Sequence, residues 1–83
     1  MQAITGATLS ALNRLRPGSR GKVARVEATG SLRRRIMEMG LVPGAEVVVE
    51  GVAPLGDPVE VTVKGYHLTL RKSEAEAVLV EVG

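Results

Sequence analysis

The sequence predicts a mainly β protein with short helices, folded as a small, partly open barrel of about five strands. One helix is expected between the strands and another at the N-terminus. Among the 83 residues, 13 are Val and nine are Leu, whereas Phe and Trp are absent. Because Val is restricted at χ1 and favours strands, this composition indicates a β fold with an aliphatic core. Alternation of Val with polar residues and two Pro-Gly turns support the same prediction.

The N-terminal helix is expected over residues 8–15. Leu9 and Leu12 fall on one helical stripe, and Thr8 is a suitable N-cap. Pro17-Gly18 then forces a turn, because Pro fixes φ and Gly accepts a positive φ. The chain should therefore turn directly into its first strand.

The first strand is predicted over residues 21–27, and the inserted helix over residues 31–39. Ser31 is the expected N-cap of this helix, and Gly40 is placed to end it as a left-handed residue. The buried face of the helix should consist of apolar residues at the spacing i, i+4, i+7, namely Leu32, Ile36 and Met39.

Alternating valines predict the remaining strands. One strand covers residues 45–52 and the next is centred on Val61. A tight turn at Lys64-Gly65 or Gly65-Tyr66 leads into a further strand, and a helical turn over residues 73–77 precedes the last strand, residues 78–82. Within each strand one face carries the apolar side chains, which are Val47 and Val49, then Val59, Val61 and Val63, then Val78, Val80 and Val82.

Composition argues against several classes of function. The formal net charge is only +2, from 11 Lys and Arg against nine Asp and Glu, so we expect no nucleic-acid partner. The absence of Cys excludes disulfides, thiolate metal sites and a cysteine nucleophile. His67 and Asp57 are the only His and Asp, which leaves few groups for acid–base chemistry. We therefore expect no enzyme and no cofactor.

The chain also lacks the signals that would direct it to a membrane. No stretch approaches the ~18 apolar residues of a membrane span. Residues 1–8 do not combine a basic segment with an apolar core, as a secretory signal does. We expect a cytoplasmic chain without direct membrane insertion, folded as a single domain over residues 1–83. A homo-oligomer is an open alternative, because an unpaired strand edge can pair with a second copy.

The inserted helix carries the motif Arg33-Arg34-Arg35, which has three interpretations. The simplest is a solvated helix face. The second is a contact surface for a protein partner, for which Arg33, Arg34 and Met37 are the candidates. The third is an anion site at the helix N-terminus. Successive helical residues point ~100° apart, so the three guanidinium groups cannot all converge on one ligand.

The segment Ala53–Pro58 reads as a turn because it is rich in Gly and Pro. Leu55 is its isolated apolar residue. A stiff loop that presents one apolar side chain can anchor a protein partner, because little entropy is lost on binding. Leu55 can equally fold back as a lid on the barrel. The candidate partner contacts in this loop are Leu55, Gly56, Asp57 and Pro58.

His67 is the only imidazole that could bind a metal. A site for a divalent transition metal would need carboxylates such as Glu60 or Glu46 beside it across the sheet. No spacing in the sequence requires that arrangement, so we expect a surface histidine and no metal site. Glu74 and Glu76 are likewise expected to be solvated.

The order of these motifs resembles the FeoA family over residues 9–82. The first part of the pattern is Leu15-x-Pro17-Gly18-x-x-Gly21-x-Val23, followed by Leu32-x-x-Arg35-Ile36-x-x-Met39-Gly40-Leu41-x-Pro43-Gly44. The second part is Ala53-Pro54-Leu55-Gly56-Asp57-Pro58, followed by Gly65-x-x-Leu68-x-Leu70-Arg71-x-x-Glu74-Ala75. The Pro54–Pro58 loop and the Leu70–Ala75 segment are the more specific pieces.

The resemblance implies an SH3-like barrel with an inserted helix. It also implies a non-enzymatic accessory or adaptor protein of bacterial ferrous-iron uptake, which binds the FeoB permease at its cytosolic GTPase region and modulates transport. The same module resembles the C-terminal domain of iron-dependent repressors, so a metal- or anion-sensing domain is the alternative. The family supplies no fixed catalytic or metal-ligand motif to carry over.

Overall fold

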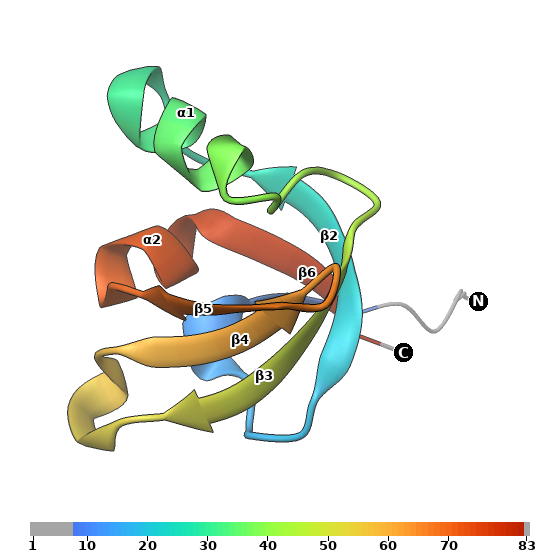
Figure 1. Ribbon diagram of the computed structural model, residues 1–83, viewed down its shortest axis with the longest axis vertical. Coiled ribbons are helices and arrows are strands. Elements are labelled where there is room, and N and C mark those ends of the chain that lie inside the picture. Colours follow the sequence, from blue (N-terminus) through green and yellow to red (C-terminus); the bar gives the residue numbers. More distant parts are fainter. Residues whose placement is uncertain (1–7, 83) are drawn as a thin grey trace.

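In residues 8–82, the part of the chain that this computed structural model describes, six antiparallel strands form one sheet. The strand order is β1-β6-β2-β3-β4-β5, and the sheet curls into a partly open barrel (Figure 1). The strands are β1 (Thr8–Ala11), β2 (Arg20–Val26), β3 (Glu46–Val52), β4 (Val59–Val63), β5 (Tyr66–Leu70) and β6 (Val78–Val82). The helical elements are η1 (Leu12–Arg14), α1 (Gly30–Glu38), η2 (Pro54–Gly56) and α2 (Lys72–Ala77). The predicted mainly β fold with an inserted helix is confirmed.

Aliphatic side chains fill the interior of the barrel, as the alternation predicts. On β3, Val47 and Val49 are 1% and 0% exposed, whereas Glu46 and Glu50 on either side of them face solvent. The large side chains that are fully buried are Leu12, Ile36, Leu41, Leu70, Val47, Val49, Val59, Val61, Val63, Val78 and Val80. Val82, at the end of its strand, is only partly buried. The absence of large rings leaves a core of small, branched side chains.

Two irregularities bend the sheet near its centre. The pairing of β2 with β6 shifts between Val23 and Arg25, and the pairing of β3 with β4 shifts between Val49 and Gly51. An extra residue in one strand of an antiparallel pair bends that strand and increases its twist. Because β2 and β3 are neighbours in the sheet, the two shifts together give the curvature that a small barrel needs.

The expected N-terminal helix is wrong. Residues Thr8–Ala11 form β1, which pairs with β6 so that Thr8 lies opposite Val82, and only Leu12–Arg14 forms a 3-10 turn. A helix of about eight residues is marginal in water by itself, whereas β6 offers the same residues backbone hydrogen-bond partners. Leu12 enters the core at 0% exposure. Thr8 therefore belongs to a sixth strand and caps no helix.

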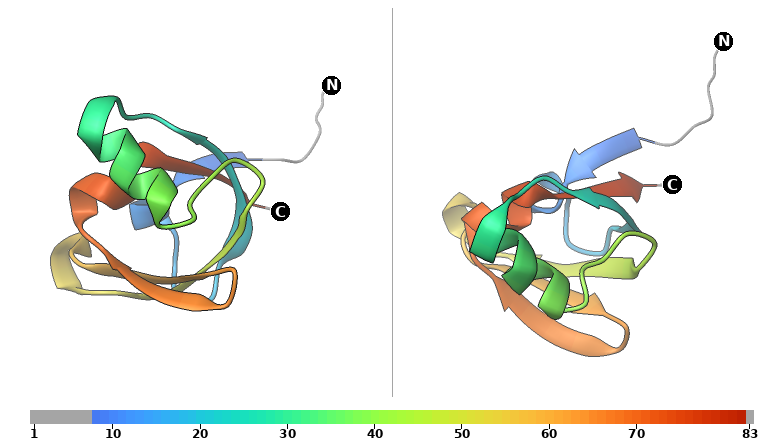
Figure 2. Two further views of the ribbon diagram at one scale, coloured as in Figure 1. Left: turned by 45° about the horizontal axis from the view of Figure 1, so that its top comes forward. Right: turned by 90° about the horizontal axis from the view of Figure 1, so that it is seen from above.

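The inserted helix matches its prediction within one residue at each end. Ile36 is fully buried, and Leu32 and Met39 pack against the margin of the core. The predicted cap is wrong, because the helix begins one residue earlier and its N-cap is Thr29, without a side-chain hydrogen bond. Gly40 has φ +97° and ends the helix in the left-handed conformation, as predicted. Figure 2 shows α1 lying over the open side of the barrel.

The β4–β5 hairpin turns at Lys64-Gly65, the first of the two predicted positions. Lys64 has φ +53° and Gly65 has φ +82°, which are the two positive values of a type I′ turn. Val63 therefore lies opposite Tyr66, and Val59 lies opposite Leu70 at the far end of the hairpin. Leu70 is buried in the core, but Tyr66 extends beyond it and is 71% exposed.

Gly21 lies where β2 passes between β3 and β6. A Cβ atom at this position would overlap the backbone oxygen of Glu81 and would lie 2.7 Å from Cγ1 of Val80. Neither group can move away easily, because one is backbone of β6 and the other is a buried core side chain. Any side chain at position 21 would separate the two strands on which closure of the barrel depends.

We predict that Gly21→Ala lowers the free energy of unfolding by about 1–3 kcal/mol, the usual cost of forcing an extra carbon into a packed site. Denaturant unfolding followed by circular dichroism measures the change. Gly51→Ala is the matched control, since Gly51 also lies in a strand but its Cβ would meet no atom within 4 Å. Equal stability of the two variants would contradict the argument.

Candidate functional site

The Ala53–Pro58 loop presents Leu55 to solvent. The side chain is 94% exposed, and its backbone has φ +74°, a left-handed conformation that costs a residue with a side chain. The alternative that Leu55 folds back as a lid on the barrel is wrong, because a side chain that covered the barrel would be buried. Gly56, with φ +77°, continues the same turn without that cost.

Backbone hydrogen bonds close this loop on itself. The N–H of Gly56 donates to the carbonyl of Ala53 at 2.8 Å, and the N–H of Ala53 donates to the carbonyl of Pro58 at 3.0 Å. Both ends of the loop are therefore fixed to each other across the start of β4. The loop presents its exposed leucine from a preorganised backbone, which limits the entropy lost on docking.

Asp57 ties the loop to the second helix. Its Oδ1 accepts a hydrogen bond from the backbone N–H of Lys72 at 3.1 Å, at the first residue of α2. A carboxylate at a helix N-terminus satisfies a free donor and is favoured by the helix dipole. This carboxylate therefore holds the loop in place, while Pro58, joined to Asp57 by a cis peptide bond, is exposed beside it.

The outer face of α1 forms a second exposed surface. Arg33 and Arg34 are exposed and Met37 is half-buried, and the three line a shallow depression together with Gly30 and Glu38. This surface lies at the opposite end of the molecule from the loop, at the top of Figure 1, whereas the yellow turn at the bottom carries Leu55. The structure therefore does not combine the predicted contact residues into one site.

Arg35 leaves this surface and reaches toward the barrel. Its Nε lies 3.6 Å from Oε2 of Glu74, whose other oxygen accepts the backbone N–H of Arg71 at 2.9 Å. Glu74 is buried at 6% exposure, so the expectation that it is solvated is wrong, while Glu76 is exposed as expected. The signal in the sequence was a Glu three residues after the N-cap, the spacing at which its carboxylate reaches back to a free N–H.

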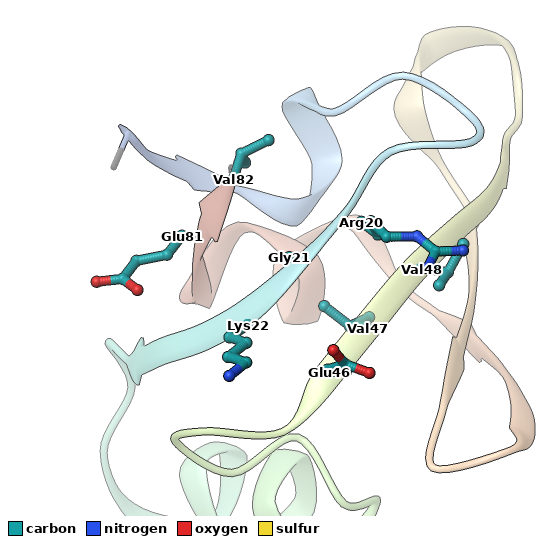
Figure 3. Close-up of a pocket in the computed structure, with 8 residues that line it drawn as sticks. All are labelled: Arg20, Gly21, Lys22, Glu46, Val47, Val48, Glu81 and Val82. Atoms are coloured by element: carbon teal, nitrogen blue, oxygen red, sulfur yellow. The ribbon is translucent and has the colours of Figure 1, made fainter. Parts of the chain in front are cut away.

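A cleft of about 270 Å³ lies between β2, β3 and β6 (Figure 3). Its floor is apolar, because Gly21 contributes no side chain and Val47 and Val82 lie on either side. Its rim carries charges of both signs, from Arg20, Lys22, Glu46 and Glu81. No local pattern in the sequence predicts this cleft, since its residues come from three strands far apart in the chain. It brings together no set of groups suited to catalysis.

His67 does face a carboxylate, with Nε2 3.4 Å from Oε1 of Glu60 on the neighbouring strand. Both side chains are about half exposed. In residues 8–82, however, no three His, Cys, Asp or Glu side chains lie close enough to hold a metal ion together. Glu46, the other carboxylate considered, borders the cleft between β2, β3 and β6. A structural transition-metal site usually takes four ligands, of which this pair supplies two.

Within the described residues no helix is long and apolar enough to span a bilayer.

The sequence profile of one known family, described as the FeoA domain, matches residues 11–82. The chain belongs to the FeoA family. A curated relative, the Fe(2+) transport protein A/Fe(2+) transporter FeoB fusion protein of Porphyromonas gingivalis, is 39% identical over 71 residues. That match covers 86% of this FeoA chain and 8% of the fusion protein, so the chain spans a small fraction of the relative's length.

Solved FeoA structures share the fold. A FeoA-like protein from Clostridium acetobutylicum is 44% identical, with a TM-score of 0.80 over 95% of this chain and 90% of that one. Stenotrophomonas maltophilia FeoA, described as a zinc complex and as a procaryotic SH3 domain protein, is 34% identical, with a TM-score of 0.73 over 83% and 86%. The SH3-like fold that the resemblance implied is confirmed.

Repressor domains share the architecture at much lower identity. A manganese-dependent transcriptional repressor superimposes with a TM-score of 0.84 over 96% of this chain and 45% of its own, at 20% identity. At that identity the likeness concerns the fold alone. The family match and the relatives above 30% identity therefore carry the assignment of this chain to the FeoA family.

We predict that Glu74→Ala lowers the free energy of unfolding by about 1–2 kcal/mol, because the part-buried backbone N–H of Arg71 loses its acceptor and Arg35 loses its counter-charge. Thermal or denaturant unfolding measures the loss. Glu76→Ala, two residues along the same helix and exposed, should change stability by less than about 0.5 kcal/mol. A Glu74 variant as stable as the Glu76 variant would contradict a structural role for the Arg35–Glu74 contact.

Proposed function

We propose that this FeoA domain is a non-enzymatic accessory protein of bacterial ferrous-iron uptake that docks on a FeoB-type permease and modulates its transport. The observation that carries the proposal is the fusion relative, in which a FeoA region and the FeoB transporter are one polypeptide. Two domains that work in contact gain from a covalent link, because it raises their effective concentration. In a separate chain, the same contact must come from a docking surface.

We assign the docking contact to the Ala53–Pro58 loop. An exposed leucine on a strained but hydrogen-bonded turn has no role in the core of the domain. Burial of a fully exposed leucine contributes about 1.5–3 kcal/mol. The fixed backbone of Gly56 and the tether from Asp57 to Lys72 mean that little of this is lost to ordering the loop.

The cytosolic GTPase region of FeoB is the proposed target of the loop, and the cytoplasm the proposed location. The outer face of α1 serves as a second contact, in which Arg33, Arg34 and Met37 offer two charges beside one partly buried apolar side chain. Its distance from the loop fits a partner that extends along the molecule. No cofactor, nucleic acid or catalytic residue is part of the proposal.

Metal sensing is the second candidate function. The observation in its favour is the His67–Glu60 contact at 3.4 Å, which supplies one nitrogen and one carboxylate donor on the outer face of the sheet. A second copy or a partner would have to complete the coordination. Zinc titration of the pure protein and of His67→Ala tests it, since equal binding by both would exclude this pair as the site.

We predict that Leu55→Asp weakens binding to the purified cytosolic region of FeoB from the same organism by at least tenfold. Calorimetry with GDP and with a non-hydrolysable GTP analogue measures the affinity. Leu9→Asp is the matched control, because Leu9 is a 47% exposed leucine on β1, at the other end of the strand order.

Two results would contradict the proposal at different levels. If the wild-type domain binds the cytosolic region in neither nucleotide state, docking on that region is wrong. If the wild type binds and Leu55→Asp binds equally well, the domain docks but the loop is not its contact.

A further inference from the structure

The strand β5 has one free edge. Among residues 8–82 it is the last strand in the sheet order and pairs only with β4. In a hairpin with a two-residue type I′ turn, the residues next to the turn, Val63 and Tyr66, exchange hydrogen bonds, and every second pair after them does the same. The backbone N–H and C=O groups of His67 and Thr69 therefore point away from β4. Within residues 8–82 neither residue has a backbone hydrogen bond outside the sheet.

Unlike a typical edge strand, β5 is bordered by exposed apolar groups. The chain's only aromatic residue, Tyr66, begins the strand at 71% exposure. Leu55 lies near its other end, because Asp57 of the same loop bonds Lys72 just after the strand. Two of the three large hydrophobic side chains exposed on the described part of the chain thus belong to β5 itself and to the loop bonded to the helix that follows it.

A cleft follows this edge on the side of α1. It has a volume of about 410 Å³ and is lined by the C-terminal end of α1 and by the β4–β5 hairpin. Met39 and Gly40 line it from the helix, and Tyr66, His67 and Leu68 line it from the strand. The free backbone groups therefore open onto a partly apolar hollow, which can receive side chains of a segment that pairs with the strand.

The charges around β5 indicate what kind of segment could pair with its free edge. Residues 64–72 contain Lys64, Arg71 and Lys72 and no carboxylate. In the part of the chain that the structure describes, the cationic side-chain group of none of these three lies within 4.0 Å of a carboxylate. Four carboxylates lie nearby. Asp57 and Glu74 accept the backbone N–H groups of Lys72 and Arg71, and Glu60 faces His67. Glu38 lines the α1 side of the cleft.

A second copy of this chain is a poor occupant of the edge. If two β5 strands paired antiparallel about Leu68, Tyr66 of one copy would lie opposite Leu70 of the other. The turn that carries Lys64 in each copy would then face the start of α2, which carries Lys72, in the other. Like charges that face each other across a strand pair destabilise it. An acidic segment would instead place its carboxylates beside these same lysines.

We propose that β5 is a strand-addition site, at which an extended segment of the protein partner, alternating apolar and acidic residues, pairs with His67 and Thr69. Backbone hydrogen bonds would supply the register, the cleft beside Met39 would take an apolar side chain, and Lys64 and Lys72 would flank the acidic ones. Tyr66 and Leu55 would close over the two ends of the segment. The proposal rests on the proposed function, since the partner it completes is the FeoB-type permease.

The test uses a peptide of about nine residues that alternates Val and Glu, titrated into the isotope-labelled domain and followed by NMR. We expect saturable shifts at the amides of His67 and Thr69, and at least tenfold weaker binding of the peptide that alternates Val and Lys. Equal binding of the two peptides, or shifts confined to β1 at the opposite edge, would overturn the proposal.

Two variants localise the effect. Thr69→Pro removes the outward N–H without removing a bond to β4 and should weaken binding of the acidic peptide at least tenfold. Its matched control is Thr69→Val, which keeps the N–H and should bind like the wild type. Should Thr69→Pro not fold, Lys64→Asp serves instead, because Asp-Gly favours the same turn while the charge is reversed. The control for charge is Arg16→Glu, which makes the same charge reversal at an exposed residue away from β5 and should bind the acidic peptide as the wild type does.

Self-association gives an independent readout. The Lys64→Asp variant turns a carboxylate toward the start of α2, with its Lys72, in a second copy, so sedimentation at high protein concentration should show more dimer than the wild type. An unchanged monomer would contradict the argument that charge at this edge excludes a second copy.

The same variants separate this inference from the proposed function. If the Thr69→Pro variant binds FeoB as tightly as the wild type does, strand addition at β5 is wrong and docking on FeoB stands. Binding of the acidic peptide at β5 without binding of FeoB would retain the edge site and reject the permease as its partner.

Discussion

The close approach of β2 and β6 at Gly21 is the constraint on which the rest of the fold depends. Because no side chain separates the two backbones there, β6 can return along β2, and its valines reach the core. The same contact puts β6 in position to receive β1 on its other side. It also leaves the apolar floor of the cleft between β2, β3 and β6, so one missing Cβ determines both packing and surface shape.

The N-terminus of α2 connects the functional surfaces. Glu74 binds the backbone N–H of Arg71 and faces Arg35 of α1, while Asp57 of the loop binds the N–H of the next residue, Lys72. The backbone N–H groups of Arg71 and Lys72 are thus adjacent binding points at the start of this six-residue helix. The first holds Glu74, which faces α1 at one end of the barrel, and the second holds the Ala53–Pro58 loop at the other end. Such a short helix has little stability of its own, so these contacts and the buried alanines keep it folded.

Most of the fold could be predicted from local sequence, and the errors have physical causes. The valine strands, α1, its terminal Gly40 and the Lys64-Gly65 turn follow from alternation and from the φ angles that glycine allows. Residues 8–11 could not be assigned correctly, because their conformation depends on pairing with β6, about 70 residues along the chain. The burial of Glu74 was missed for the same reason, since its partner Arg35 lies on another element. In the candidate site, an exposed Leu55 was one of the two outcomes that the sequence predicted. The free edge of β5 could not be predicted, because it depends on the order of the strands in the sheet, which no local sequence pattern gives.

The single tyrosine gives this domain an optical label that needs no engineering. With no Trp or Phe in the chain, all near-ultraviolet emission comes from one phenol ring at the start of β5. The ring is 71% exposed, so its emission reports the solvent and the contacts at that one point of the surface. A partner that lacks both tryptophan and tyrosine can be titrated against this signal directly, whereas a bound tryptophan would quench it by energy transfer.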